Sequence, residues 1–170
     1  LKTASLGTAV TLSTLSYSRI AGANDRIYIG MIGCGGRSHE HFKQISAYKD
    51  KENVEIIAVC DPWKEKREKM AKMVKDVYGK DPQQFESYLE LLEKAKVDAV
   101  VIASADHMHA RQLEATAKMK KHAYCEKPLA NNMKELLPAY AAVKENKVIV
   151  QIGTQLRSYA SFTGAREVYK

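Results

Sequence analysis

A lysine follows an apolar run in the segment "HAYCEKPLANN", residues 122–132. Lys127 stands where the chain leaves this run, between Glu126 and a proline. Open α/β sheets bind ligands at the carboxyl ends of their strands, and an ammonium placed there can hold a substrate alkoxide or relay its proton. The same lysine could instead be a solvated charge at a surface turn. Lys127 is therefore a candidate catalytic residue whose role depends on the rest of the chain.

A glycine-rich stretch follows the first apolar run. "GMIGCGGRS" places Gly33 and Gly35 in the first two glycine positions of the dinucleotide fingerprint G-x-G-x-x-G, with Ser38 in the third. Those glycines allow a tight turn and the close approach of a pyrophosphate to a helix N-terminus. The fingerprint also expects a carboxylate at the end of the second strand, and Asp61 in "AVCDPW" stands there. An aspartate before a proline is also a common turn former.

The carboxylate of Asp61 bears on the choice of cofactor. A carboxylate at this position accepts hydrogen bonds from the ribose hydroxyls of NAD, whereas the 2′-phosphate of NADP would meet a like charge. The sequence therefore predicts NAD. Lys64 follows three residues later, and a nearby ammonium could offset that repulsion, so NADP stays possible.

These residues need a scaffold that gathers strand ends. Apolar runs rich in β-branched residues predict strands at 26–33, 54–61, 97–104, 122–126 and 148–153. Helical periodicity predicts helices at 64–78, 107–120 and 133–146, and "FESYLELLEKA" predicts a minor strand or turn followed by a further helix. Buried strands alternating with helices predict an α/β fold with a doubly wound parallel sheet of the Rossmann type.

The three long helices are expected to bury one apolar face each. That face includes Met70 and Val74 in the first helix. In the second it consists of Met108, Leu113, Ala117 and, more weakly, Met119; in the third it consists of Leu136, Leu137, Tyr140, Ala141 and Val143. Each face should pack on the sheet or on a neighbouring helix.

Composition narrows the function classes. The chain of 170 residues is 45% hydrophobic and 28% charged, which is typical of a globular domain that buries a core. The net charge is +7, but the lysines are interleaved with glutamates on expected helix faces, as in "KEKREKMAKMVK". Without a basic arm or interleaved aromatic residues, the pattern predicts no nucleic-acid partner.

Cysteines and histidines do not predict a metal site. The cysteines are Cys34, Cys60 and Cys125. They lie at or near the ends of apolar runs and have no C-x-x-C spacing, so they are expected to be free and buried. His107 and His109 form an H-x-H pair, but their side chains diverge at a helix start and a third ligand is missing. His39 and His41 are expected on a helix face.

The opening residues predict an export signal. "LKTASLGTAVTLSTLSYSRIAGAN" is rich in small and hydroxyl side chains and ends in an A-x-A-like site at residues 21–23. Residues 1–23 are therefore expected to be the remnant of a signal, of the twin-arginine type by its wording, and the protein to be periplasmic without stable membrane insertion after cleavage. A polar tail is the alternative.

Five stretches together resemble the glucose-fructose oxidoreductase / inositol dehydrogenase (Gfo/Idh/MocA) family. They are "IGCGGR", "AVCDPW", "DAVVIASADHMHA", "YCEKPLA" and "QIGTQLRS", and they extend from about residue 27 to 158. Ser104 and Ala105 depart from the family's threonine-proline, which predicts a looser turn. The resemblance implies a Rossmann domain over 24–153. It also implies an α+β substrate domain of which only the start, 154–170, is included here.

The resemblance also implies roles for individual residues. It makes Lys127 the active-site lysine. The cofactor contacts that it implies are Gly33, Gly35, Gly36, Arg37, Asp61, Ser104, His109, Glu126, Lys127, Gln155 and Arg157. The implied cofactor is NAD, with NADP possible, and the implied substrate is a sugar or polyol. Self-association would come through the C-terminal domain.

Three functions are open at this point. The resemblance favours an NAD(P)-dependent oxidoreductase that moves hydride between a sugar or cyclitol CH–OH group and nicotinamide. An NAD-dependent glycosidase of the same superfamily is an alternative, although such members tend not to carry "EKP" at this position. A non-catalytic dinucleotide-binding module is the third. The identity of the substrate depends on residues outside this chain.

Overall fold

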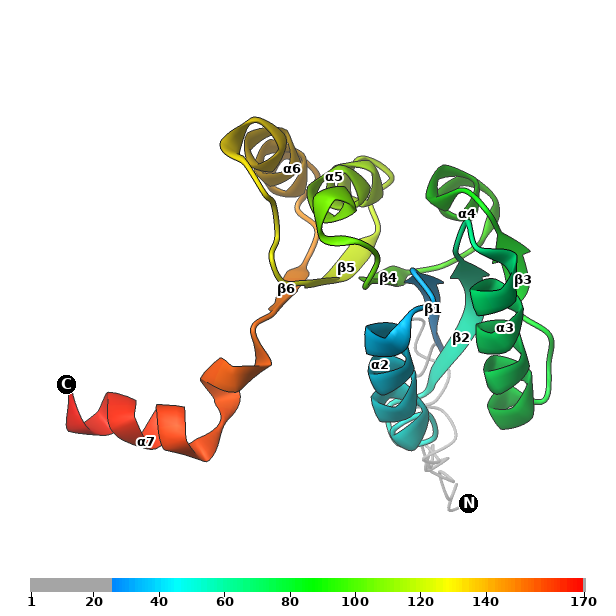
Figure 1. Cartoon of the computed structure of the whole chain (residues 1–170), viewed down its shortest axis with the longest axis horizontal. Helices are drawn as coiled ribbons and strands as arrows, with labels where there is room; N and C mark the ends of the chain where they lie inside the picture. Colours follow the sequence, from blue (N-terminus) through cyan, green and yellow to red (C-terminus); the bar gives the residue numbers. More distant parts are fainter. Residues whose placement is uncertain (1–25, 170) are drawn as a thin grey trace, which may run out of the picture.

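Six strands pair in parallel to form one sheet (Figure 1). The computed structural model describes residues 26–169. The strands are β1 (Ile27–Ile32), β2 (Val54–Cys60), β3 (Gln83–Phe85), β4 (Ala99–Ile102), β5 (His122–Glu126) and β6 (Val150–Gly153). Their spatial order is β3-β2-β1-β4-β5-β6, and all neighbours are parallel. This is the strand order of a Rossmann domain, and the predicted fold class is confirmed.

Helices cover both faces of the sheet. The helices are α2 (Gly36–Ala47), α3 (Lys64–Tyr78), α4 (Tyr88–Lys94), α5 (His109–Lys118), α6 (Met133–Asn146) and α7 (Ala160–Val168), with the 3-10 helices η1 (Asp106–Met108) and η2 (Gln155–Ser158). In Figure 1, α2 and α3 lie on one face, and α4, α5 and α6 lie on the other. Helix α7 projects away from both layers, so its packing does not contribute to the core.

Side chains that alternate along the central strands fill two cores. Met31 of β1 and Val101 of β4 pack with residues of α2 and α3. Their neighbours Ile32 and Ile102 point to the opposite face and pack with residues of α4 and α5. All four are at most 6% exposed. Burial on both faces explains why these strands appear in the sequence as continuous apolar runs instead of alternating ones.

The predicted bounds of α3 and α6 match the structure, but the predicted apolar face of α6 is only partly correct. Val143 packs against the core as predicted. Leu137 and Tyr140 are 57% and 58% exposed, whereas Ala139 and Ala142 are buried. Ala142 packs with Ala117 of the neighbouring α5. Small side chains let two helices approach closely, so the helix turns its alanines inward and leaves its larger side chains outside.

The helix expected over 107–120 is divided in two. A 3-10 turn, η1, precedes α5, which ends at Lys118. Leu113 and Ala117 are buried as predicted, but Met119 is 40% exposed. Lys120 has a positive φ of 56°, which ends the helical path just after Met119. Met119 is therefore the C-cap of α5, where the chain leaves the helix, and it does not belong to the core.

The three cysteines are free and buried, as predicted. Cys34, Cys60 and Cys125 belong to the apolar clusters of the two cores. Burial raises the pKa of each thiol to about 12, and the nearby carboxylates of Asp61 and Glu126 add to the shift. A thiol with such a pKa carries almost no nucleophilic thiolate near neutral pH, so these residues act as small apolar side chains.

Two predictions about the chain ends are not tested by the fold. The expected signal, residues 1–23, lies outside the described residues. The expected boundary after residue 153 coincides with the end of β6, but the domain division itself stays a prediction. Between residues 26 and 169 no helix combines the length and the apolar character needed to cross a membrane.

The turn after β1 yields a stability prediction. Gly33 has φ +87°, and a Cβ atom there would lie 2.7 Å from backbone atoms of Ala103 and Ser104. Gly33→Ala should therefore lower the free energy of unfolding by about 1–3 kcal/mol or more. Gly36→Ala is the matched control, because its added Cβ meets nothing within 4 Å. Urea denaturation of both variants tests this; equal stability of the two would contradict a close approach at Gly33.

Candidate active site

Four of the predicted site residues lie within two residues of the carboxyl ends of parallel strands. Gly33 comes after β1, Asp61 after β2, Ser104 two residues after β4, and Lys127 after β5. Because the strands are parallel, these positions share the carboxyl edge of the sheet. The structure thus confirms the predicted gathering of the four residues at one edge, which is where open α/β sheets bind ligands.

The loop between β1 and α2 leaves room for a phosphate. Gly35 is the N-cap of α2, and no side chain caps the helix. Added Cβ atoms at Gly35 and Gly36 would meet nothing within 4 Å. The Ser38 hydroxyl donates to the Gly33 carbonyl, so serine in the third fingerprint position braces the turn. The first N–H groups of α2 are therefore available to an anion.

Asp61, which follows β2, binds the backbone of the glycine loop that follows β1. Its Oδ2 accepts from the Cys34 backbone N–H and its Oδ1 from that of Trp63, both at 2.8 Å. The residue is 9% exposed, and Arg67 Nη1 donates to its carbonyl at 2.6 Å. Each carboxylate oxygen can accept a second hydrogen bond, so Asp61 is preorganised for further donors such as ribose hydroxyls.

A cavity of about 690 Å³ lies beside Asp61. Its lining includes Gly33, Asp61, Trp63, Lys66 and Met108. Trp63 is 56% exposed, and the Lys66 ammonium stands 4.6 Å from the centre of its ring. An exposed indole next to a carboxylate and a glycine turn offers a flat surface for a planar, aromatic ligand group. Trp63 was not among the predicted site residues.

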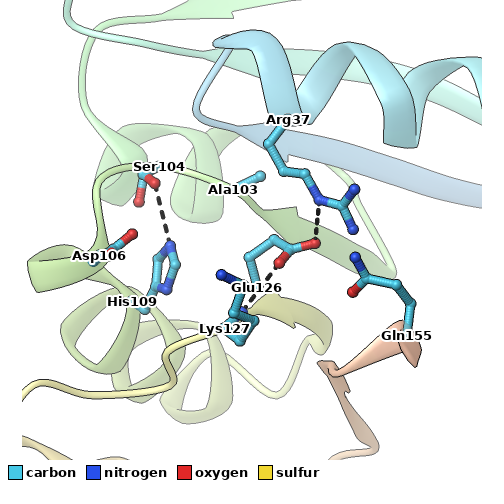
Figure 2. A pocket seen from close by; sticks show the side chains of 8 residues that line it. All are labelled: Arg37, Ala103, Ser104, Asp106, His109, Glu126, Lys127 and Gln155. Atoms are coloured by element: carbon cyan, nitrogen blue, oxygen red, sulfur yellow. Dashed lines mark hydrogen bonds and ion pairs between the residues drawn. The ribbon is translucent and has the colours of Figure 1, made fainter. Parts of the chain in front are cut away.

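A second cavity, of about 390 Å³, contains the candidate lysine (Figure 2). It is lined by Arg37, Ala103, Ser104, Asp106, His109, Glu126, Lys127 and Gln155. Six of these eight residues were predicted as site residues. The two that were not are Ala103, which is next to Ser104, and Asp106. Lys127 is exposed and precedes Pro128 through a cis peptide bond. Across residues 26–169, no acidic side chain forms an ion pair with its ammonium.

Glu126 is enclosed by hydrogen-bond donors. Its Oε1 accepts from Arg37 Nε at 2.6 Å and contacts His41 Nε2 at 2.8 Å, while its Oε2 accepts from the Lys127 backbone N–H at 3.2 Å. The residue is 4% exposed. Burial alone would raise the pKa of Glu126, but the bonds from Arg37, His41 and the Lys127 amide outweigh it and lower that pKa.

His41 was predicted as a helix-face residue, and that reading is incomplete. Its imidazole contacts Glu126 and stacks edge-on against the Tyr124 ring, with centroids 4.7 Å apart. Burial lowers the pKa of His41, and the charge of Arg37 lowers it further against the opposing pull of Glu126. The ring is therefore neutral near pH 7, and it donates a hydrogen bond to Glu126 without forming an ion pair.

His109 is buried between two loops. Its Nδ1 lies 2.7 Å from the Pro128 carbonyl and its Nε2 lies 3.2 Å from the Ser104 carbonyl. The Ser104 hydroxyl in turn donates to Gln112 Oε1 at 2.6 Å. His109 lines the lysine cavity, and its contact with the cofactor stays a prediction. Because its ring nitrogens face carbonyl oxygens, the ring ties the turn after β4 to the turn after β5.

The two predicted residues beyond β6 differ in position. With its amide oriented to satisfy both ends, Gln155 accepts from Arg37 Nη2 at 2.9 Å and donates to the Gly153 carbonyl. It lies beside Arg37 in Figure 2. Arg157 does not line the same cavity; it lines a neighbouring one of about 260 Å³ together with Lys127. Among the described residues, no group of three or more potential ligands could hold a metal.

A family model describes most of the chain. The model for the oxidoreductase family Gfo/Idh/MocA, NAD-binding Rossmann fold, matches residues 27–154. The chain belongs to this family. It therefore carries the family's NAD-binding domain, and the glycine turn, the uncapped start of α2 and Asp61 are the features of this structure that suit that cofactor.

Similar sequences include dehydrogenases and glycosidases. Myo-inositol 2-dehydrogenase of Thermotoga maritima is 33% identical over 140 residues, which is 82% of this chain and 39% of that protein. Glycosyl hydrolase family 109 protein 1 of Akkermansia muciniphila is 30% identical over 116 residues, which is 66% of this chain and 24% of that protein. The chain thus spans well under half the length of these family members.

Solved structures share the fold. An oxidoreductase from Thermotoga maritima has a TM-score of 0.73 and 27% identity, covering 85% of this chain and 43% of its own. The WlbA dehydrogenase from Chromobacterium violaceum, solved with NADH and UDP-GlcNAcA, has a TM-score of 0.78 and 20% identity, covering 86% of this chain and 40% of its own. The second likeness concerns the fold alone.

Trp63 allows a direct test of cofactor orientation, because it is the one tryptophan in the 170 residues. ADP-ribose and NADH should change its fluorescence, whereas nicotinamide mononucleotide, which lacks adenosine, should not. NADPH should bind about tenfold more weakly than NADH, or weaker still, because its 2′-phosphate approaches the Asp61 carboxylate. Fluorescence titration measures each affinity. A response to nicotinamide mononucleotide equal to that of ADP-ribose would place the adenosine elsewhere.

The lowered pKa of Glu126 makes a prediction about acid stability. A carboxyl group with a lowered folded-state pKa stabilises the fold above its unfolded value, about 4.5, and this contribution is lost as the pH falls through the folded value. Wild type should therefore exceed Glu126→Gln in stability at about pH 6, and the difference should shrink below about pH 4.5. Urea denaturation across pH measures this. Glu135→Gln, at a more exposed Arg-bound carboxylate, is the control, and a difference that persists to about pH 2 would contradict the assignment.

Proposed function

We propose that this chain is the cofactor-binding part of an NAD-dependent oxidoreductase acting on a CH–OH group of a sugar or polyol. The observation that carries the proposal is Lys127, which forms no ion pair with any residue of 26–169 and lines a cavity at the carboxyl edge of an NAD-binding sheet. The relatives named as inositol dehydrogenases support the substrate class. Export of the protein is a further proposal, and it rests on residues 1–23 alone.

Lys127 suits the role of binding the reacting oxygen. When bound, the nicotinamide supplies the hydride acceptor or donor. In its ammonium form, Lys127 donates a hydrogen bond to the substrate oxygen and stabilises the negative charge that builds there as the O–H proton leaves. The absence of an ion pair within the described chain leaves its N–H groups for that oxygen.

The other titratable groups of the cavity differ in their availability for proton transfer. His109 has carbonyl oxygens at both ring nitrogens, and Glu126 is bound by Arg37 and His41. Asp106 lines the cavity and is exposed. Of the residues described here, Asp106 and Lys127 are thus the groups able to exchange a proton with the substrate, and the remainder of the protein is expected to contribute further groups.

Glycoside cleavage is the second candidate, because two of the similar proteins are named as glycosyl hydrolases of family 109. An NAD-dependent glycosidase oxidises its sugar transiently and re-reduces it, so it releases an alcohol without net reduction of NAD. Incubation of the complete protein with NAD and either myo-inositol or a 4-nitrophenyl glycoside separates the two. Accumulating NADH supports the dehydrogenase, and release of 4-nitrophenol without NADH supports the glycosidase.

Substitution of Lys127 tests its catalytic role. In the complete protein, Lys127→Ala should lower turnover by about 10²-fold or more, the scale for loss of a positioned acid-base group. NAD affinity should hardly change, because the adenosine half binds at Gly33 and Asp61. Lys127→Arg should restore little, because a guanidinium is larger and keeps its proton.

Lys118→Ala is the matched control. Lys118 is an exposed lysine on α5 that pairs with Glu114, so its loss should leave steady-state turnover unchanged. If Lys127→Ala kept the turnover of wild type, Lys127 would be a surface charge and the proposed mechanism would fail.

A further inference from the structure

The buried carboxylate of Glu126 joins segments that are distant in the sequence. Arg37 and His41 come from α2, which begins at the glycine loop, and they lie 89 and 85 residues from Glu126. The third donor is the backbone N–H of Lys127. A buried carboxylate is costly unless donors surround it, so these contacts form as a set.

Strand β6 is shaped to admit this carboxylate. Gly153 is paired with Glu126 in the sheet register. A Cβ atom at Gly153 would lie 2.8 Å from Cδ and 2.9 Å from Oε2 of Glu126, which is closer than side-chain carbons approach other atoms. Glycine at this position has no positive φ to explain it. Its absent side chain makes the space that Oε2 occupies, and Oε2 is the atom that accepts from the Lys127 amide.

The Lys127 backbone depends on this contact for its hydrogen bond. Lys127 follows the last residue of β5, and within the described chain its N–H donates to Glu126 Oε2 alone. The same carboxylate is anchored to α2 through Oε1. The lysine backbone is therefore connected by one side chain to the helix that opens at the glycine loop.

We propose that Glu126 is a positioning residue, which holds the Lys127 backbone against α2 so that the ammonium enters its cavity from a constant point relative to the glycine loop. This proposal rests on the proposed catalytic role of Lys127. Arg37 and His41 act on the lysine through Glu126, and Gly153 makes room for it. None of the four is required to touch the substrate.

Amide hydrogen exchange of this chain, without substrate, is the first test. Glu126→Gln replaces an acceptor-only group by an amide whose NH₂ must face a donor: Arg37 and His41 on one side, or the Lys127 N–H on the other. Because the charged Arg37 forms the stronger hydrogen bond, the amide oxygen should face Arg37 and the NH₂ should face the Lys127 N–H. Exchange of the Lys127 amide should then become about tenfold faster or more, as expected for loss of one hydrogen bond. The Val100 and Val101 amides of β4 report global opening in the same sample.

Control variants separate positioning from general destabilisation. Glu135→Gln makes the same chemical change at a carboxylate bound by Arg111 and should leave Lys127 exchange unchanged. If Glu126→Gln fails to fold, Gly153→Ala displaces Oε2 without changing any charge and should have the same local effect. Acceleration of the Lys127 and β4 amides by equal factors, or none at Lys127, would overturn the proposal.

A double-mutant cycle in the complete protein tests whether Glu126 acts through the lysine. With the polyol that wild type oxidises, myo-inositol being the first probe, Glu126→Gln should lower kcat by about 10-fold to 10²-fold and leave ADP-ribose affinity within about twofold. In a Lys127→Ala background the same substitution should lower kcat no further. An equal loss in both backgrounds would overturn positioning. If Lys127→Ala itself had no effect, the proposed function would fail. Amide exchange would still show whether Glu126 holds the Lys127 N–H.

Discussion

The site depends on the parallel pairing of β1 with a neighbour on each side. β1 pairs with β2 through one edge and with β4 through the other. Because all three strands run in one direction, the residues that follow them reach a single edge of the sheet. The chain moves outward from β1 to β3 and then crosses to β4, so the loops after β1 and β4 diverge there and leave a crevice for a ligand.

Two buried carboxylates stabilise the loops that border this crevice, and they do so differently. Asp61 accepts from backbone N–H groups of the loops after β1 and β2, so its bonds do not depend on the identity of the donor side chains. Glu126 accepts mainly from Arg37 and His41. Changes in those two side chains alter the surroundings of Glu126 directly, whereas Asp61 depends on the conformation of the backbone.

Local patterns were sufficient to predict much of the fold. Apolar runs marked the strands, and helical periodicity gave the observed bounds of α3 and α6. The order of strand, glycine turn and helix also placed Gly33 and Asp61 correctly at the sheet edge. These features depend on residues close together in the sequence, where spacing and side-chain type determine the conformation.

Contacts between distant segments were not predictable in the same way. The predicted apolar face of α6 included Leu137 and Tyr140, which are exposed, because the close approach of α5 turns Ala139 and Ala142 inward instead. The contact of His41 with Glu126 spans 85 residues. One signal was present: Arg37 and His41 are four residues apart on one helix, so they share a face, and that face meets the end of β5.

The two cavities at the carboxyl edge of the sheet are lined by residues with different expected roles. Asp61 and Trp63 line one, Lys127 and Glu126 line the other, and Ser104 contributes to both. A dinucleotide is long enough to place its adenosine and its nicotinamide at different strand ends. Changes at Asp61 should therefore act mainly on cofactor affinity, and changes at Glu126 mainly on the reacting groups. Ser104 lines both cavities, and its carbonyl faces the His109 ring. Changes in the turn after β4 should therefore affect both cofactor affinity and the reacting groups.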